Sequence, residues 1–488
     1  MKLLSTLLLL FTFSIAVAQY TTPGTGEDWT LDDIATASPG TVTVSGTTYT
    51  LLEDLTIAGS DILRINADLT LEIEADVRIT VLDLGSFFVE ANAVTITAVD
   101  EALPYEGFRF EEGATVAIEN ATIQFGGGLQ VLTETFTLEN CVLTNNVSGV
   151  ATGATVTLSR GIPVITNNQF LFNANPAISS GATNQVSAII SDNYIEGNNQ
   201  TNNNRPQINM GATRVNDTLK IINNTIIGDV AIDQAGGIAV ANLAGGTLRA
   251  IIEGNTIVDN RYGVTVVGPN SYALIKDNVI EDNNTQGDPM LGGSGINLNS
   301  PPGDLNVDIT GNEIRRNLWG VTIQGPVDAN LGDDEDNPGL NVFSENGNNG
   351  EIFALYNNGP NTITAKHNCW VENGDGTLAE AEGVIFHIED DPTLGEVIFD
   401  PVFCEVLSTE DPTLAAFSVY PNPANNKITF QNTNNFEQVT FYTLSGQEVL
   451  TQKVTEGTNT ITFNLSAGVY FVAFDGNKNQ AVKKIVVK

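Results

Sequence analysis

One short motif repeats through the middle of the chain and constrains the fold more than any other feature. It consists of an asparagine, any residue, a large apolar residue, two further residues and a second asparagine. Successive copies lie 23 to 34 residues apart, a spacing typical of solenoids. The copies are Asn140/Asn145, Asn168/Asn173, Asn193/Asn198, Asn255/Asn260, Asn278/Asn283, Asn312/Asn317, Asn341/Asn346 and Asn368/Asn373, with Asn224/Asp229 as a near-match.

The apolar residue of each motif predicts an inward-facing stack. Side chains alternate between the two faces of a strand, and neighbouring strands lie about 4.8 Å apart, so equivalent residues of successive coils lie above one another. Asparagine suits the corners, because it tolerates left-handed backbone and its amide can bond to the same amide one coil above. The predicted stack is Val142, Phe170, Ile195, Ile226, Ile257, Ile280, Ile314, Phe343 and Trp370.

Segments on either side of the repeat set the expected domain limits. Upstream alternation of apolar and polar residues extends the stack to about Thr48. Before it, Leu31 and Ile34 have helical spacing and are expected to cap the first coil. The expected parts are a cap segment over 19–47, a parallel β-helix over 48–404, a linker over 405–413 and a separate domain over 414–488.

The repeat resembles that of right-handed parallel β-helix proteins, a group that includes pectate lyases, periplasmic copper-site accessory proteins and many surface adhesins. The resemblance covers about Thr48 to Val402. It implies an all-β fold, a right-handed parallel β-helix solenoid followed by a small C-terminal β-sandwich. It implies little about function, because one fold serves many activities.

Residues 414–488 differ from the solenoid in pattern and in charge. They carry six lysines and four acidic residues, a net charge of +2, whereas the whole chain carries −38. Short alternating segments bounded by turn residues predict a sandwich of about seven strands. The segments YPNP from Tyr420, LSGQEV from Leu444, LSAGVYFV from Leu465 and KKIVVK from Lys483 resemble the type A C-terminal sorting domain of the type IX secretion system of Bacteroidota. The resemblance implies that the translocon of that system is a partner and that the protein is secreted or displayed outside the outer membrane.

The first eighteen residues, MKLLSTLLLLFTFSIAVA, are typical of a signal peptide, with cleavage expected between Ala18 and Gln19. No later segment has the length of a transmembrane helix, so none is expected in the mature chain. The strongly negative charge disfavours nucleic acid as a partner, since such binding requires clusters of Lys and Arg.

Three cysteines are too few to form the main scaffold. Cys369 and Cys404 are one candidate disulfide, which would leave Cys141 unpaired. The alternative, that all three are small apolar side chains, stays open.

A row of charged residues is the candidate catalytic site. The fourth position after the first asparagine holds Asp259, Asp282, Arg316 and Glu345 on successive coils. Carboxylates stacked in this way can share a proton or bind Ca²⁺. The alternative is a solvated edge, because earlier copies place Thr144, Phe172, Gly197 and Gly228 there.

An acidic loop supplies a second set of candidate metal ligands. Asp333, Asp334 and Asp336 could attract Ca²⁺ but lack the spacing of an EF-hand, so a solvated loop is the alternative. No other cofactor is predicted.

Two functional hypotheses follow. The favoured one is a non-enzymatic secreted or surface protein for adhesion, glycan binding or matrix structure. The alternative is a Ca²⁺-assisted polysaccharide lyase or glycoside hydrolase acting along the β-helix face. The paired-Asp and His-Gly motifs of polygalacturonase-like enzymes are missing from the sequence, which weakens the second hypothesis.

Overall fold

A computed structural model describes residues 19–300, 303–404, 419–420, 424–432, 436–443, 447–455, 457–466, 468–476 and 480–487. The chain divides into two compact units, residues 1–404 and 405–488. The expected signal segment up to Ala18, the expected linker and parts of the YPNP and LSGQEV segments lie outside the described residues. Within the described residues, no helix has the length and apolar character needed to span a bilayer.

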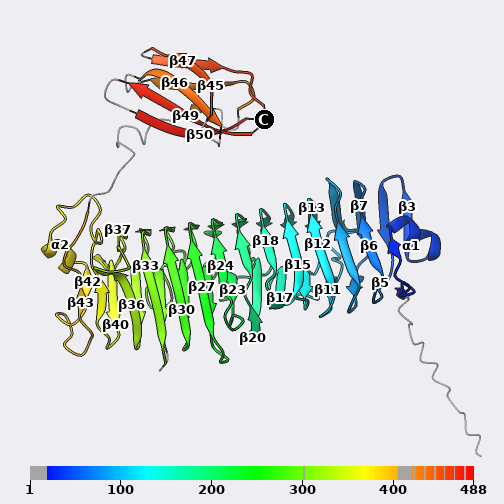
Figure 1. Ribbon diagram of the computed structural model, residues 1–488, viewed down its shortest axis with the longest axis horizontal. Helices are drawn as coiled ribbons and strands as arrows, with labels where there is room; N and C mark the ends of the chain where they lie inside the picture. Colours follow the sequence, from blue (N-terminus) through cyan, green and yellow to red (C-terminus); the bar gives the residue numbers. More distant parts are fainter. Residues whose placement is uncertain are drawn as a thin grey trace, which may run out of the picture. The chain divides into compact units, whose positions relative to one another are not determined.

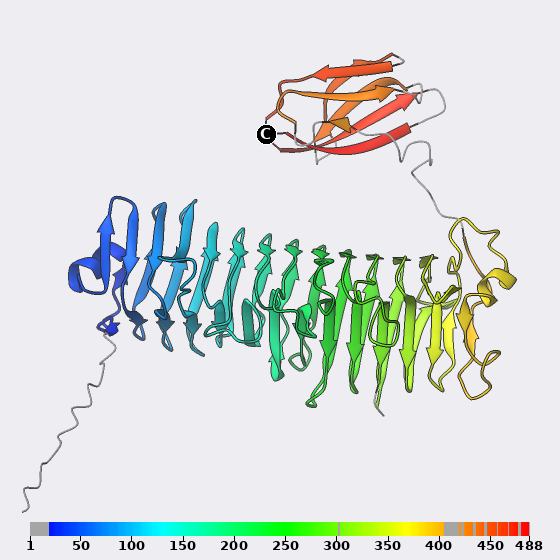
Figure 2. The same cartoon turned by 180° about the vertical axis from the view of Figure 1, so that it is seen from behind.

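The first unit is a stack of coils, each supplying one short strand to each of three long parallel sheets (Figures 1 and 2). Sheet 1 contains β1 (Gln19–Thr21), β5 (Asp54–Ile57), β8 (Arg78–Val81), β11 (Gly107–Phe110), β14 (Leu129–Val131), β17 (Val156–Gly161), β20 (Ile178–Val186), β23 (Pro206–Met210), β26 (Gly236–Ala241), β29 (Val264–Val267), β32 (Ser294–Asn299), β35 (Trp319–Gln324), β40 (Leu355–Asn358) and β42 (Ile385–Phe386).

The other two sheets run beside it. Sheet 2 contains β3 (Val42–Ser45), β4 (Thr48–Leu51), β7 (Leu69–Ile73), β10 (Val94–Ala98), β13 (Ala121–Gln124), β16 (Val142–Thr144), β19 (Gln169–Leu171), β22 (Tyr194–Glu196), β25 (Thr225–Ile227), β28 (Thr256–Val258), β31 (Val279–Glu281), β34 (Glu313–Arg315) and β37 (Val342–Ser344). Sheet 3 contains β2 (Asp28–Trp29), β6 (Ile62–Ile65), β9 (Ser86–Val89), β12 (Thr115–Glu119), β15 (Thr135–Glu139), β18 (Val164–Thr166), β21 (Ile189–Ser191), β24 (Leu219–Ile222), β27 (Leu248–Glu253), β30 (Ser271–Lys276), β33 (Leu305–Thr310), β36 (Val327–Gly332), β41 (Ile363–Ala365) and β43 (Val397–Ile398). The chain passes from sheet 3 to sheet 2 to sheet 1 in each coil. This architecture is the predicted parallel β-helix.

The apolar stack inside sheet 2 confirms the repeat pattern, with one error of register. Phe170, Ile195 and the later residues of the predicted stack face inward and are buried. In the first copy of the motif, the inward-facing residue is one position later than predicted. Leu143 pairs with Phe170 and is buried, whereas Val142 pairs with Gln169 and is only half-buried. At the other end, the rings of Phe343 and Trp370 stack with centroids 4.8 Å apart.

Two buried ladders of amides hold the corners on either side of sheet 2. In each ladder, the backbone N–H and the Nδ2 of one asparagine donate to the Oδ1 of the asparagine one coil further on, as at Asn255 and Asn278, both 2.9 Å. The same Nδ2 also donates to a carbonyl of the preceding coil. The ladder between sheets 3 and 2 contains Asn168, Asn193, Asn224, Asn255, Asn278, Asn312, Asn341 and Asn368.

The second ladder, which lies between sheets 2 and 1, departs from the predicted motif at three places. It begins at Asn146, not Asn145. Asp229 does not take part, and Gln207 fills its place by accepting from Asn198 (3.1 Å) and donating to Asn260 (2.9 Å). Asn373, the last predicted member, is exposed. The ladder contains Asn146, Asn173, Asn198, Gln207, Asn260, Asn283, Asn317 and Asn346.

The left-handed residue of each corner is the one before the ladder asparagine, rather than the asparagine itself. Asn167 and Asn223, which precede ladder asparagines, have φ of 57° and 56°. This explains the register error, because asparagine is favoured at both adjacent positions.

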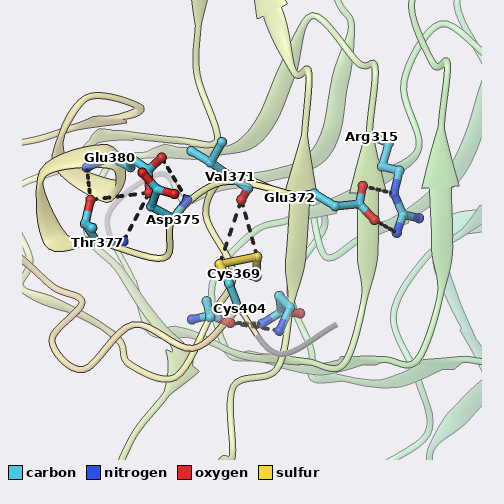
Figure 3. The surroundings of a disulfide bond; sticks show 10 residues. Arg315, Cys369, Val371, Glu372, Asp375, Thr377, Glu380 and Cys404 are labelled. Carbon is cyan, nitrogen blue, oxygen red and sulfur yellow. Dashed lines mark hydrogen bonds and ion pairs between the residues drawn. A yellow bond between two sulfur atoms is a disulfide. The ribbon is translucent and has the colours of Figure 1, made fainter. Parts of the chain in front are cut away.

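Both ends of the solenoid are covered. At the start, β1 and β2 already pair with β5 and β6, so the sheets begin well before the expected Thr48. Helix α1 (Leu31–Ala37) buries Leu31 and Ile34, and the β3–β4 hairpin closes sheet 2 in antiparallel fashion. At the far end, α2 (Leu378–Glu382) and a disulfide between Cys369 and Cys404 lie beside the last coils (Figure 3). A short hairpin, β38 (Gly347–Asn348) with β39 (Glu351–Ile352), lies in a late corner.

The second unit is a small antiparallel sandwich with its own core. One sheet contains β44 (Val419–Tyr420), β45 (Lys427–Asn432) and β48 (Gly457–Thr462). The other contains β47 (Glu448–Lys453), β46 (Phe436–Thr443), β49 (Gly468–Gly476) and β50 (Gln480–Val487). Phe430 of the first sheet packs edge-on against Phe474 of the second, 4.8 Å between ring centroids.

Candidate functional site

The structure brings the four candidate catalytic residues together, but on a structural corner. Asp259, Asp282, Arg316 and Glu345 each directly precede a residue of the second ladder and each have φ between 53° and 56°. Their shared position therefore follows from the left-handed turn between sheets 2 and 1. A polar side chain at such a turn is what backbone conformation alone favours.

One arginine of this row pairs with one of its carboxylates. Arg316 donates to both oxygens of Asp282, at 2.9 and 2.8 Å, and to Glu281 at 2.6 Å. On the neighbouring row, Arg315 forms a two-pronged pair with Glu372, at 2.7 and 2.8 Å (Figure 3). Hydrogen bonds from the Arg315 guanidinium lower the pKa of Glu372. Burial, followed by the charge of Asp282, raises the pKa of Asp259. Arg315 and Arg316 therefore offset part of the negative charge that stacks along this corner.

Two carboxylates of the acidic loop already bind other groups of the protein. Asp333 accepts hydrogen bonds from the backbone N–H groups of Glu335, Asp336 and Asn337, at 2.8 to 3.0 Å. Asp334 pairs with Lys366 and, at 3.1 Å, with His367. Within the part of the chain that the structure describes, no three His, Cys, Asp or Glu side chains are grouped to hold a metal ion.

A cleft that the sequence did not predict lies on the outer face of sheet 1, across β29, β32, β35 and β40. Its volume is about 420 Å³. The strand register places Thr265, Asn297, Thr322 and Tyr356 in one outward-facing column along its floor. Thr322 donates to Asn297 at 3.0 Å, so the floor is a connected set of hydroxyl and amide groups.

Aromatic rings form one wall of this cleft. Trp319 lies 5.0 Å from Tyr356 and 4.8 Å from Phe353, between ring centroids. Tyr356 in turn stacks on Phe386, with centroids 4.6 Å apart and ring planes 8° from parallel. All four rings are half-exposed. Outward-facing aromatic rings beside amides are suited to ligands with one apolar face and many hydroxyl groups.

A corner loop over residues 284–293 forms another part of the lining. The indole N–H of Trp319 donates to the Pro289 carbonyl at 3.0 Å, and Arg261 donates to the Leu291 carbonyl. A Cβ on Gly292 would lie only 3.0 Å from Arg261 Nε, so glycine lets the loop rest directly on the guanidinium. Met290, at the tip, is 85% exposed. The loop is therefore held in place while its tip faces solvent.

The chemistry of the cleft differs from that of the rest of the molecule. Its described lining residues include one arginine but neither Asp nor Glu, although the chain carries 58 acidic residues. None of the four predicted catalytic residues lines it. The cleft can thus donate and accept hydrogen bonds and stack against rings, but its lining offers no carboxylate for acid or base catalysis.

One signal in the sequence could have located this cleft. An aromatic residue directly precedes the glycine that enters sheet 1 in two copies of the repeat, as Tyr262–Gly263 and Trp319–Gly320. Both rings line the cleft. Asn204 and Arg261 carry no comparable signal, because they come from different corners that only the stacking brings together.

Comparison with known proteins identifies the second unit. The family of secretion system C-terminal sorting domains matches residues 418–488, so this unit is the sorting domain of the type IX secretion system. It marks the protein for secretion or display at the cell surface. No curated protein matches the chain.

Two solved structures show distant likeness. One is a complex of the alginate lyase AlyF-OU02, with 13% identity over 80% of this chain and 88% of that chain and a TM-score of 0.30. The other is the full-length tailspike protein 2 of the Escherichia coli O157:H7 bacteriophage CAB120, with 11% identity over 91% of this chain and 59% of that chain and a TM-score of 0.24. At TM-scores this low, neither likeness bears on function.

Proposed function

We propose that the exported solenoid is a non-enzymatic glycan-binding protein that holds a polysaccharide in the cleft of sheet 1. The observation that carries the proposal is the wall of Trp319 and Tyr356 beside a floor of hydroxyl and amide groups. A sugar ring presents C–H groups on one face and hydroxyls at its edge, so it can use both surfaces at once. Display outside the cell places this cleft where polysaccharides occur.

The absence of carboxylates from the described lining favours binding over cleavage. Hydrolysis of a glycosidic bond uses two carboxyl groups on either side of it. Asp259 and Asp282 belong to the corner row, where Arg316 pairs with Asp282, and neither lines the cleft. The described lining therefore holds no pair of acids for hydrolysis of a ligand.

Affinity electrophoresis of the full chain through gels that contain plant and algal polysaccharides tests the proposal. At least one polymer should retard the protein. Tyr356→Ala should weaken binding about tenfold or more, which is typical of an aromatic anchor. Tyr272→Ala is the matched control, because Tyr272 projects from sheet 3 and is 38% exposed. Equal loss in both variants, or no retardation by any polymer, would contradict the proposal.

Incubation with the same polymers separates binding from catalysis. No reducing or unsaturated sugar ends should be released. Release that is abolished by Asp259→Asn would instead favour the lyase or hydrolase hypothesis.

A further inference from the structure

Arg261 is the one charged residue among the described residues that line the cleft. It follows Asn260 of the second ladder and is only 9% exposed. Its Nη1 donates to Asn204 Oδ1 at 2.5 Å, and its Nη2 donates to the Leu291 carbonyl. Both acceptors are neutral. Arg261 therefore joins two corner loops while keeping its charge beside the cleft.

Among the described residues, no carboxylate lies within ion-pair distance of this guanidinium. None of the ion pairs among the described residues includes Arg261, and its buried Nε has no hydrogen-bond partner. Arg315 and Arg316, two coils further on, each bind carboxylates. Arg261 has no such partner among these ion pairs, although it is nearly buried.

A buried cation without a counter-ion is costly, and the cost falls when a ligand supplies the opposite charge. The guanidinium group matches carboxylates and sulfates particularly well, because its N–H groups can donate two parallel hydrogen bonds to them. The carboxylate-free lining of the cleft adds nothing that would repel an anion at short range.

We infer that the cleft recognises an acidic sugar, whose carboxylate or sulfate ester pairs with Arg261 while the sugar ring packs on the aromatic wall. This inference rests on the proposed function and specifies the ligand class. The net charge of −38 does not prevent such binding, since repulsion from charges farther than about 8 Å is largely screened at physiological ionic strength.

Matched polymers provide the test. A polyuronate is compared with the same polymer after chemical reduction of its carboxyl groups to alcohols, and a sulfated polysaccharide with its desulfated form. The full chain should bind the charged member of one pair about tenfold or more tightly than its neutral form. Which pair shows the preference identifies the anion. Added salt should weaken binding of the charged polymer but not of the neutral one.

Two variants assign the preference to Arg261. Arg261→Gln keeps an N–H donor near the Leu291 carbonyl but removes the charge, so it should bind both members of the pair equally. Arg261→Lys keeps the charge but not the two-pronged geometry, so it should retain part of the preference. Melting temperatures report whether either variant has lost its fold. If either variant has lost its fold, the salt dependence of polymer binding by the unaltered protein tests the inference.

The outcomes separate this inference from the proposed function. Equal affinity for charged and neutral polymers, with binding still dependent on Tyr356, would overturn the inference and leave glycan binding intact. Failure of every polymer to bind the unaltered protein would overturn both.

Discussion

Single asparagines carry much of the order in this solenoid. Asn255 is 1% exposed, and its side chain takes part in bonds to the coil before and the coil after. A buried amide that loses its partner pays a desolvation penalty that an exposed amide does not. Each ladder residue therefore fixes the register of two neighbouring coils.

We expect Asn255→Ala to lower the free energy of unfolding by about 2 to 4 kcal/mol. It removes the Oδ1 that accepts from the backbone N–H and the Nδ2 of Asn224, and the Nδ2 that donates to Asn278 and Ile221. Asn306→Ala is the control. Asn306 lies on the exposed face of β33, and its replacement should change stability by less than about 0.5 kcal/mol. Urea denaturation followed by circular dichroism measures both. Similar losses in the two variants would argue against the ladder's role.

Glu372 should make the stability of the solenoid depend on pH. Its pKa is lowered in the folded state, chiefly by hydrogen bonds from Arg315. A carboxyl group with a depressed pKa adds stability above its unfolded-state pKa, and this contribution is lost as the pH falls through the folded-state pKa. Acid should therefore weaken the solenoid near its last coils.

Glu372→Gln should lower stability at about pH 7 by about 1 kcal/mol and flatten the further loss on acidification. Glu313→Gln serves for comparison, because Glu313 contacts the same arginine but its side chain is 49% exposed. Its effect should be smaller. Denaturation curves recorded from neutral to acidic pH provide the measurement, and an unchanged acid slope in Glu372→Gln would refute the assignment.

At the scale of elements, no strand of sheet 2 could stand alone. Strands such as β28 and β31 contain three residues each and bury one side chain each. Their stability comes from the coils above and below, as in other repeat proteins. The end elements face solvent on one side, so they need other supports, and the disulfide at Cys369 and Cys404 is one of them.

Reduction of this disulfide should destabilise the last coils by about 2 to 4 kcal/mol, since the bridge closes a loop across 35 residues. Hydrogen exchange should show faster opening around α2 and β42. A Cys369→Ala/Cys404→Ala variant should already open at this rate and should not respond to reductant. A reductant effect that persists in the variant would point to another cause, because Cys141 is the remaining cysteine and is buried.

At the scale of the whole molecule, the two units divide the work. Each has its own apolar core, so the sorting domain and the solenoid do not depend on one shared core. The sorting domain directs the chain across the outer membrane, and the solenoid remains as the part available for function.

Deletion of residues 418–488 should therefore block surface display without unfolding the solenoid. The truncated chain should accumulate in the periplasm of the producing cell and keep the melting temperature of the intact solenoid. Protease accessibility of whole cells measures display. Fusion of residues 418–488 to an unrelated periplasmic protein is the reciprocal control and should bring that protein to the surface. Surface display of the truncated chain would contradict the assignment.

The residue pattern alone predicted the parallel β-helix, the stack that runs from Phe170 to Trp370 and the sorting domain. These features are periodic or local, so spacing and residue type encode them directly. It misplaced Val142 because an asparagine suits both the left-handed turn and the ladder position after it. Gln207 was missed because it joins the ladder from a neighbouring strand.

The position of the cleft, by contrast, follows from the tertiary structure. The charged residues selected from the sequence fall on one turn of each coil, where Arg316 pairs with Asp282. The cleft instead combines Asn204, Arg261, Trp319 and Tyr356 from separate coils. Their proximity depends on how loops of different length fold over the stacked strands, and no spacing along the chain records that geometry.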